Sequence, residues 1–405
     1  MSDGLLSGIR ILDLSMHLSG PYGSLLMADM GAEVIKIEPP TGDPTRASGP
    51  LKGEVPLMFA AINRNKKSVS IDLRDPRGRE LFLRVVAEAD IVFHNFRPGV
   101  MDRLGLSTDI LKEANPKIIV GQLSGYGTTS PRRNAPAFDV AIQARSGVMG
   151  ITGHPGTPPA RAGVPIADLA GGMFLVISVL AALVKRGRVD EPVELDISMF
   201  DCQLSLLMYW AALALNLNED IPPQGSGNSK VVPYGAYETT DSYIIIAVFS
   251  NDFWPKLCRA IGRPDLESDP RYRTNNGRVE LRDELEREIA AEFKKADTAT
   301  WLKVLDEHDV PSGPVNGIRN AFAEPDVEAR DMLLDITADG LNFAFAGNPI
   351  KSSHEFDGRE LAPRLGQHTR EVLADLLKLD EAALADLHSA GVLRTDTHYR
   401  IPIDS

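Results

Sequence analysis

Short runs of apolar residues alternate with longer segments of helical spacing in the N-terminal part of the chain. We expect strands at residues 8–15, 33–38, 68–73, 91–94 and 117–123. Residues 20–30 and 77–89, which lie between these runs, are typical of helices. Pro21 suits a first helical turn, and Leu81 and Val85 stand one turn apart. The alternation predicts an α/β fold in which helices cover a parallel sheet, as in a Rossmann-like large domain.

The longest apolar segment runs from Val164 to Val184 and contains one ionisable side chain, Asp168. A carboxylate in such a run must find hydrogen-bond donors or carry a shifted pKa. Two interpretations are open on these residues alone, an N-cap of the following helix and a catalytic carboxylate. The run is nearly long enough to span a membrane. Asp168, the pair Gly171-Gly172 and the lack of a second such run indicate a buried core helix instead.

The second half of the sequence predicts a smaller α+β domain. A second apolar helix is expected at 199–215, followed by a linker rich in Asn, Pro and Gly at 216–230. Further expected elements are a buried strand at 243–249, helices at 253–261, 280–294 and 298–308, a hairpin at 337–349, and short helices at 369–377 and 380–390. The predicted divisions are the large domain at 1–200, a helix and linker at 201–230, the small domain at 231–325, a linker at 326–350, and a C-terminal part at 351–405 that returns to the large domain.

Composition narrows the classes of partner. The chain has 405 residues and a formal net charge of −13, which argues against nucleic acid or an anionic membrane as the main partner. The two cysteines form neither a disulfide framework nor a zinc pattern. No His, Asp or Glu spacing resembles a metal site, so we expect no metal. The first residues lack the pattern of a signal peptide, and we expect a cytoplasmic protein.

Basic residues suggest a phosphorylated ligand, although the standard nucleotide motifs are missing. The first expected strand leads into SMHLSGPY (15–22) rather than G-x-G-x-x-G, and there is no Walker motif. Basic residues cluster at 63–67, and Arg74 follows closely. Arg97 and Arg103 come after the fourth strand. These residues either bind a phosphorylated ligand or form solvated loops, and both interpretations stay open.

Eight segments carry a family resemblance. In chain order they are GIRILDLS…GP (8–21), GAEVIKIEPPTGDPTR (31–46), NRNKKSVSIDL (63–73), HNFRPGVMDRLGL (94–106), LSGYG (123–127), PAFDVAIQA (136–144), GVPIADLAGG (163–172) and LGQHTREVL (365–373). The chain resembles the family III CoA-transferases, which include formyl-CoA transferase and carnitine CoA-transferase and share their fold with the α-methylacyl-CoA racemases. The resemblance implies an enzyme that moves CoA from an acyl-CoA to a carboxylic acid, or within one dicarboxylic acid. It also implies that coenzyme A is a substrate rather than a permanently bound cofactor.

The resemblance assigns Asp168 the role of the nucleophile. Its carboxylate would attack the acyl-CoA thioester to give a mixed anhydride and then an aspartyl-CoA thioester, which the acceptor acid attacks in turn. Apolar surroundings would exclude water from these intermediates. A helix N-terminus would keep the carboxylate ionised. We therefore expect Asp168 to cap the helix and to act as the nucleophile.

The resemblance also implies residues for binding the substrates. Those implied for CoA are Ile71, Arg74, Asn95, Phe96, Arg103 and Lys66, whose positive charges would face the phosphates while backbone near Ile71 and Phe96 flanks the adenine. Those implied for the substrate pocket are His17, Leu18 and Phe138. Leu18 replaces a glutamine of formyl-CoA transferase, and the glycine-rich loop of that enzyme is not evident after Pro233. Formyl-CoA and oxalate are therefore not the expected substrate pair.

One position separates the transferases from the racemases. The racemases carry a His-Asp pair where this chain has Phe138-Asp139. Phenylalanine cannot transfer a proton, so two-base racemisation would lack a base. Asp139 either orients the site or is a structural carboxylate. The alternatives to a transferase are an α-methylacyl-CoA racemase or epimerase and a CoA-binding protein without turnover.

The resemblance implies an interlocked homodimer, in which each chain passes through a ring formed by the other. The linkers near 200–230 and 325–350 would let one chain encircle its partner. The substrate carboxylates would then lie near the large domain of one chain and the small domain of the other. Succinyl-CoA is an expected donor because relatives commonly use it.

Overall fold

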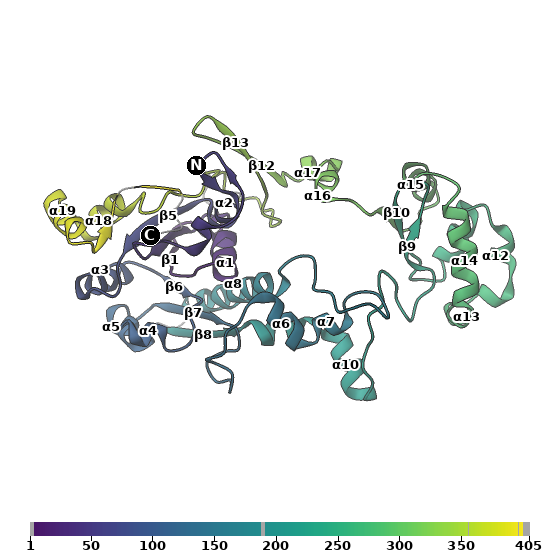
Figure 1. The fold of residues 1–405 in the computed structure, drawn as a ribbon, viewed down its shortest axis with the longest axis horizontal. Coiled ribbons are helices and arrows are strands. Elements are labelled where there is room, and N and C mark those ends of the chain that lie inside the picture. The colour runs from purple at the N-terminus through teal and green to yellow at the C-terminus, as the bar shows by residue number, and fades with distance from the viewer. Residues whose placement is uncertain (1–3, 188–190, 355, 396, 400–405) are drawn as a thin grey trace. The chain divides into compact units, whose positions relative to one another are not determined.

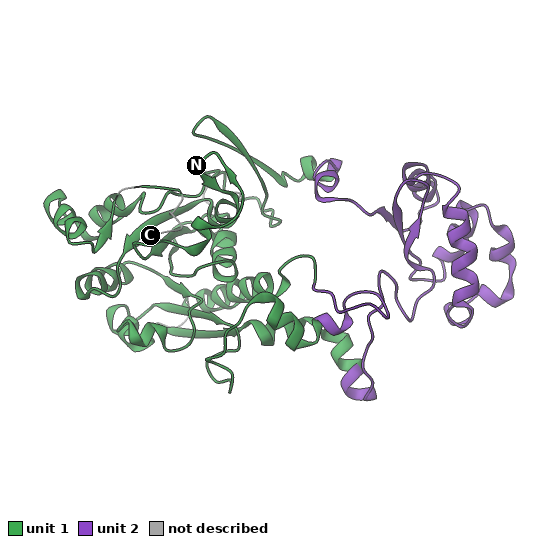
Figure 2. Ribbon diagram, in the orientation of Figure 1, with its two compact units in different colours: residues 1–148, 162–213, 326–405 green, residues 149–161, 214–325 purple. Residues whose placement is uncertain are grey.

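The structure is a computed structural model that describes residues 4–187, 191–354, 356–395 and 397–399. The chain divides into two compact units (Figure 2). Unit 1 consists of Met1–Val148, Ala162–Leu213 and Asp326–Ser405, and unit 2 consists of Met149–Arg161 and Ala214–Pro325. The chain therefore leaves unit 1 twice and returns to it twice, and the first excursion is the short segment Met149–Arg161.

Unit 1 is built on a seven-stranded sheet (Figure 1). Its strands are β1 (Arg10–Asp13), β2 (Glu33–Glu38), β5 (Lys66–Ile71), β6 (Ile91–His94), β7 (Ile119–Ser124), β8 (Val193–Ser198) and β14 (Leu393–Arg394). The order is β14-β5-β2-β1-β6-β7-β8, and only β14 is antiparallel to its neighbour. The six parallel strands follow the doubly wound Rossmann order, which reverses between β1 and β6. Ligands of such sheets bind beyond the carboxyl ends of the strands near this reversal.

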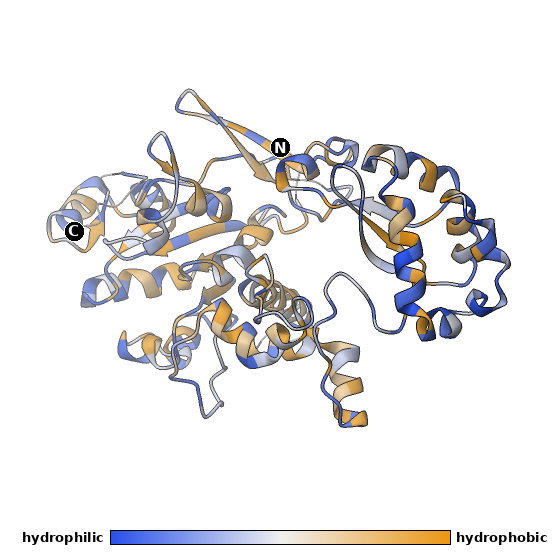
Figure 3. Cartoon of the chain, turned by 45° about the vertical axis from the view of Figure 1, so that its right-hand side comes forward, coloured by the Kyte–Doolittle hydropathy of each residue, from blue (hydrophilic) through white to orange (hydrophobic). Residues whose placement is uncertain are grey.

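Helices cover both faces of the sheet. They are α1 (Ser19–Ala28), α3 (Pro76–Val86), α4 (Val100–Arg103), α5 (Thr108–Ala114), α6 (Asp139–Ser146), α8 (Ile166–Arg186), α9 (Met199–Leu206), α18 (Thr369–Leu377) and α19 (Glu381–Ser389). Alternate strand residues enter different cores: Ile11 packs with α1 and α8, whereas Leu12 packs with α3 and α18. The strands are therefore apolar on both faces, as Figure 3 shows by hydropathy. This arrangement confirms the expected α/β fold with a mainly parallel sheet.

Helix α8 is long and apolar enough to cross a membrane by length and composition. In the fold it packs against α1 and against β7 and β8, which is the position of a core helix. It connects the parallel strands β7 and β8, so its direction is opposite to theirs. The first turn of α8 therefore lies at the edge where the parallel strands end. This edge is also where the ligand crevice of the sheet is expected.

Two expectations about unit 1 need correction. The apolar helix expected at 199–215 is two helices, α9 and α10 (Met208–Leu217), which meet at a bend of 77°. Met208 has a φ of 40°, and this left-handed residue ends the regular helix. Strand β8 was not expected, although Val193, Leu195 and Ile197 alternate with polar residues. It is an edge strand, and its first half is only partly buried.

The remaining elements of unit 1 surround the sheet. They are a 3₁₀ helix η1 (Pro44–Ala47), the pair β3 (Leu51–Lys52) and β4 (Val55–Pro56), α2 (Leu57–Asn63), and the hairpin β12 (Leu333–Ala338) and β13 (Leu341–Ala346). The hairpin lies where 337–349 predicted one. Its Phe343 and Phe345 pack with Phe59 of α2 in a separate small core. Two short helices, α7 (Val148–Ile151) and α17 (Pro325–Ala329), lie where the chain passes between the units.

Unit 2 has its own core. Its sheet has the order β11 (Ser312–Pro314), β10 (Tyr243–Ala247) and β9 (Tyr234–Glu238), all antiparallel. Its helices are α11 (Phe253–Ala260), α12 (Pro264–Ser268), α13 (Asn275–Glu280), α14 (Arg282–Phe293), α15 (Thr298–Glu307) and α16 (Ile318–Ala321), with a 3₁₀ helix η2 (Pro270–Tyr272). Trp254, Tyr272 and Phe293 are buried in this core. The expected strand at 243–249 and the expected helices at 253–261, 280–294 and 298–308 correspond to β10, α11, α14 and α15.

Helices α1 and α8 cross at two glycines, and this contact positions the first turn of α8. A Cβ added at Gly172 would lie 2.5 Å from the carbonyl oxygen of Ser19 and 3.2 Å from the nitrogen of Gly23. A Cβ at Gly23 would lie 3.0 Å from the carbonyl oxygen of Gly172. The backbones of the two helices therefore touch, one helical turn after Asp168.

We expect Gly172→Ala to lower the free energy of unfolding by about 1–3 kcal/mol, because the added methyl group forces α1 and α8 apart. The matched control is Gly187→Ala at the end of the same helix, where the nearest heavy atom to an added Cβ is 3.6 Å away. Its stability should change by less than about 1 kcal/mol. Urea denaturation measures both values, and equal losses in the two variants would contradict the close contact.

Candidate active site

Asp168 lies in the first turn of α8, but it does not cap that helix. The N-cap position is Pro165, which provides no side-chain cap. The capping group comes from α6 instead: Oδ1 of Asp139 accepts the backbone N–H of Ala167 at 2.8 Å and that of Asp168 at 3.3 Å. The expected cap role of Asp168 is therefore wrong. A carboxylate from another helix has taken the free amides.

The carboxyl group of Asp168 carries a raised pKa. The side chain is half-buried, and burial together with the negative charge of Asp139 raises its pKa to about 7. We had expected the helix N-terminus to keep this carboxylate ionised. The structure reverses that expectation because the amides that would stabilise the charge are bonded to Asp139. Close to neutral pH the group is thus a basic, weakly stabilised carboxylate.

The loop after β1 leads into α1, which packs against α8. Asn95, which follows β6, holds this loop: its Oδ1 accepts the N–H of Met16 at 2.8 Å, and its Nδ2 donates to the carbonyl of Met16 at 2.7 Å. The same Nδ2 donates to Oγ of Ser19 at 3.2 Å. The amide of Asn95, which the resemblance implied for CoA binding, is therefore used to fix the loop.

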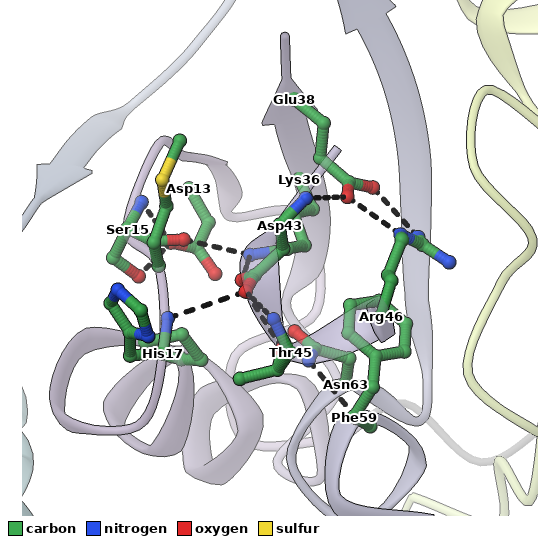
Figure 4. Close-up of polar contacts among 12 residues, drawn as sticks. Asp13, Ser15, His17, Lys36, Glu38, Asp43, Thr45, Arg46, Phe59 and Asn63 are labelled. Atoms are coloured by element: carbon green, nitrogen blue, oxygen red, sulfur yellow. Dashed lines mark hydrogen bonds and ion pairs between the residues drawn. The ribbon is translucent and has the colours of Figure 1, made fainter. Parts of the chain in front are cut away.

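The residues on either side of Met16 are held as well (Figure 4). Nζ of Lys36 donates to the carbonyl of Ser15 at 2.7 Å and pairs with Asp43 at 3.0 Å. Oδ1 of Asp43 accepts the N–H of His17 at 3.4 Å. His17 itself has a φ of 64° and an exposed side chain. Three consecutive backbone units are thus fixed by side chains from three parts of the chain.

Lys66 lies beneath this loop and not at the surface. Its fully buried ammonium contacts Oδ2 of Asp13 at 3.2 Å, the carbonyl of Pro21 at 2.9 Å and Oδ1 of Asn63 at 2.9 Å. Burial lowers its pKa to about 8. The structure does not bring Lys66 to a position where it could face a phosphate, so its expected role in CoA binding needs correction. Its charge instead compensates Asp13 inside the core.

A pocket of about 280 Å³ opens at the carboxyl ends of β1, β2, β5 and β6. Its lining includes Ile71, Arg74, Phe96 and Arg103, four of the residues implied for CoA, together with Met16 of the fixed loop. Most of the remaining lining is aliphatic, from residues such as Leu14, Ile37 and Val100. Both arginines are exposed. The pocket therefore offers mostly apolar walls and two arginines, beside the carboxylates of Glu38 and Asp72, at the reversal point of the sheet.

Four arginines near this edge have guanidinium groups without an ion pair or hydrogen bond to any residue that the structure describes. They are Arg74, Arg97, Arg103 and Arg133. Arg77 on α3, by contrast, is paired with Asp75. Arg97, Arg103 and Arg133 line a second hollow of about 560 Å³ that also contains acidic residues. Sequence reasoning did not single out Arg133, because it lies far along the chain in an irregular segment.

The residues implied for the substrate pocket do not line the pocket at the strand ends. Phe138 precedes the first residue of α6 and is 69% exposed. His17 is exposed and Leu18 half-buried at the start of α1. Sequence reasoning also missed Gln143, a fully buried residue whose Nε2 donates to Asp139 at 2.6 Å. Its spacing of one turn after Asp139 is the signal that could have revealed it.

Among the residues that the structure describes, no three His, Cys, Asp or Glu side chains are arranged to hold a metal ion. Cys202 and Cys258 are both buried and free. Burial raises the pKa of each thiol to about 12, so neither is an activated nucleophile. Within this part of the chain, Asp168 is the nucleophile candidate that lies at the ligand edge of the sheet.

The sequence and the fold both match known proteins. The model of CoA-transferase family III matches residues 6–369. The succinyl-CoA:glutarate CoA-transferase of Mus musculus is 34% identical over 392 residues, which are 96% of this chain and 90% of the relative. The acetyl-CoA:oxalate CoA-transferase of Acetobacter aceti is 37% identical, over 90% of this chain and 94% of the relative.

A solved structure agrees with these matches. The crystal structure of a CaiB/BaiF family protein from Brucella suis has a TM-score of 0.84 and 33% sequence identity, and the match covers 92% of this chain and 100% of that one. The resemblance inferred from the sequence motifs is thereby confirmed. The chain belongs to CoA-transferase family III.

Proposed function

We propose that this CoA-transferase works through Asp168 as a covalent nucleophile. The observation that supports this most is the pair of carboxylates at the start of α8: Asp139 takes the helix amides, and Asp168 is left with a pKa of about 7. A basic carboxylate without strong hydrogen-bond donors is a reactive nucleophile. It lies at the same edge of the sheet as the pocket lined by Arg74 and Arg103.

The proposed reaction consists of acyl exchanges on Asp168. An oxygen of Asp168 attacks the thioester carbonyl of the donor, the C–S bond breaks, and CoA leaves as a thiolate from the mixed anhydride. The thiolate attacks the aspartyl carbonyl, which gives aspartyl-CoA and the donor's free carboxylate. The acceptor carboxylate then attacks aspartyl-CoA and releases the thiolate. Attack of the thiolate on the acceptor's acyl carbon gives the new acyl-CoA and restores Asp168.

The surroundings of Asp139 argue against racemisation. A racemase requires a second group that exchanges a proton with the α-carbon. Phe138 has no such proton, and Oδ1 and Oδ2 of Asp139 both accept hydrogen bonds. We propose that Asp139 is a positioning residue that fixes the end of α8 and raises the pKa of Asp168.

The pocket at the strand ends is the proposed site for coenzyme A. Its aliphatic walls and Phe96 suit the adenine and the pantetheine chain, while Arg74 and Arg103 suit the phosphates. Met16 lines this pocket, and Ser19, three residues later, touches Gly172, one turn beyond Asp168. A ligand bound along the fixed loop, with its phosphates at the two arginines, would therefore bring its opposite end close to Asp168.

We propose a dicarboxylic acid as the acceptor. Relatives at 33–37% identity are named for glutarate, oxalate, mesaconate and D-citramalate, and three of these four names give succinyl-CoA as the donor. Each of these acids carries two carboxyl groups. Oxalate stays among the candidates because the oxalate enzyme of Acetobacter aceti is 37% identical, even though Leu18 and the missing glycine-rich loop argue against formyl-CoA as its donor.

We also propose that the chain acts as an interlocked homodimer. One face of α8 exposes Met173, Ile177 and Val184, although this helix is otherwise in the core. Met208 and Leu215 of α10 are 68% and 82% exposed. Exposed apolar side chains on two helices are typical of a subunit interface. A second copy of the chain would cover them.

Replacing the nucleophile tests the proposal most directly. We expect Asp168→Asn to reduce CoA transfer by at least about 10⁴-fold while acyl-CoA still binds. In the native protein, hydroxylamine added with succinyl-CoA should convert Asp168 to a hydroxamate that peptide mass spectrometry detects. The mechanism is contradicted if CoA binds but no adduct forms at Asp168. A CoA-binding protein without turnover would give that result.

The pKa of Asp168 predicts the pH dependence of transfer. Because the ionised form is the nucleophile and its pKa is about 7, the rate should fall about tenfold per pH unit below pH 7. In Asp139→Asn the negative charge is removed, so the pKa of Asp168 falls and the acidic limb moves to lower pH. The profile of kcat/KM for the donor measures both effects. An unmoved limb would show that Asp139 does not act on Asp168.

The unpaired arginines predict which residues bind the phosphates of CoA. We expect Arg103→Gln to raise KM for the acyl-CoA about 10- to 100-fold, because a charge-assisted hydrogen bond is lost. KM for the acceptor acid should not change. The matched control is Arg77→Gln on α3, whose guanidinium is exposed and paired with Asp75, and its KM values should stay those of the native enzyme. Equal effects in both variants would argue against a specific phosphate contact.

A further inference from the structure

Gln143 of α6 connects Asp139 to the segment that precedes α8. Its side chain is fully buried. Nε2 donates to Oδ2 of Asp139 at 2.6 Å, and Oε1 accepts the backbone N–H of Ala162 at 2.9 Å. Ala162 is the residue at which the chain returns to unit 1 from the segment Met149–Arg161. One amide therefore fixes both Asp139 and the approach to α8.

The contact with Gln143 determines how Asp139 can bind the helix. With Oδ2 held by Gln143, Oδ1 is directed at the amides of Ala167 and Asp168. These amides would otherwise be free, since Pro165 provides no cap. The positive end of the helix dipole would then act on Asp168, the carboxylate that remains in the first turn. Without a fixed Asp139, the helix end would therefore stabilise the charge of Asp168 instead.

We propose that Gln143 is a positioning residue for CoA transfer: by holding Asp139 on the end of α8, it keeps the carboxylate of Asp168 free to attack the acyl-CoA. This inference rests on the proposed role of Asp168 as the nucleophile. Only a side chain that donates from one atom and accepts at another can serve Asp139 and Ala162 together. Glutamine satisfies both, whereas a hydrocarbon of equal size satisfies neither.

The charges around Asp168 agree with this role. The elements packed against α8 carry few charged residues: Asp139 and Arg145 on α6, Asp201 on α9, and Glu194 and Asp196 on β8. Of these, Asp139 is the one whose charge raises the pKa of Asp168. Glu194 contacts Lys112, and Asp196 contacts Thr128. A displacement of Asp139 should therefore change the pKa of Asp168.

The test replaces Gln143 by Met, which has a similar volume but no donor. We expect kcat for transfer from succinyl-CoA to glutarate to fall about tenfold, with KM for succinyl-CoA unchanged because Gln143 does not line the CoA pocket. We also expect the pKa of Asp168 to fall by about one unit, because the uncompensated end of α8 then stabilises its carboxylate. Infrared difference spectra between each protein and its Asp168→Asn counterpart report this pKa without requiring turnover.

A matched control separates positioning from simple destabilisation. Gln203 of α9 is also fully buried, and its Nε2 donates to the carbonyl of Ile166 at 3.2 Å, in the same turn of α8. Gln203→Met should lower the melting temperature without moving the pKa of Asp168. If Gln143→Met also leaves that pKa unmoved, Gln143 is only structural and the proposal is overturned.

A conservative variant keeps the test decisive if Gln143→Met does not fold. In Gln143→Glu, the introduced carboxylic acid would, while protonated, donate to Asp139 and accept from Ala162, so transfer should approach the native rate near neutral pH. As the pH rises and the shared proton is lost, repulsion between the two carboxylates should reduce the rate, which gives a bell-shaped profile. A variant that keeps the native profile overturns the proposal. If hydroxylamine trapping fails at Asp168 while these pKa shifts occur, the proposed function fails but the positioning contact stands.

Discussion

The site depends on a competition between two carboxylates for one helix end. The first amides of α8 can stabilise one negative charge well. They donate to Asp139, which lies on the neighbouring helix α6. Asp168 is then half-buried beside a like charge, and its pKa rises to about 7. The raised pKa lowers the stability of the fold at neutral pH. An unfolded aspartate ionises near pH 3.8, so stability is lost as the pH rises from that value through 7, where the folded chain must hold the ionised form.

The parallel sheet brings the parts of this site to one edge. Because α8 connects two parallel strands, its first turn lies where β1, β5 and β6 end. The close crossing at Gly23 and Gly172 then fixes the position of Asp168 relative to the loop after β1. That loop has little regular structure of its own, and buried charges hold it in place. The desolvation of Lys36, Lys66 and their acidic partners therefore serves to fix a short connection next to the ligand edge.

The sequence revealed the local features of this arrangement and missed those that depend on distant partners. Strand β2 and helix α18 follow from residue patterns within a single segment, and they lie where these patterns predicted them. Asp168 stood out because a lone carboxylate in an apolar run requires an explanation. Which carboxylate caps α8 could not be inferred, because Asp139 lies 29 residues before Asp168 in the sequence. For the same reason, Lys66 resembled a phosphate ligand until its buried partner Asp13 was known.

The raised pKa also bears on the direction of the proposed reaction. In the mixed anhydride, the CoA thiolate can attack either carbonyl carbon. Attack at the aspartyl carbon expels the donor's carboxylate, whose conjugate acid has a pKa of about 4. Attack at the donor's carbon expels Asp168, with a pKa of about 7, and therefore the poorer leaving group. The electronic preference thus favours aspartyl-CoA over return to the starting thioester, and it equally disfavours the last step, in which attack at the acceptor's carbon expels Asp168. The raised pKa therefore favours aspartyl-CoA, the intermediate that either carboxylic acid can attack.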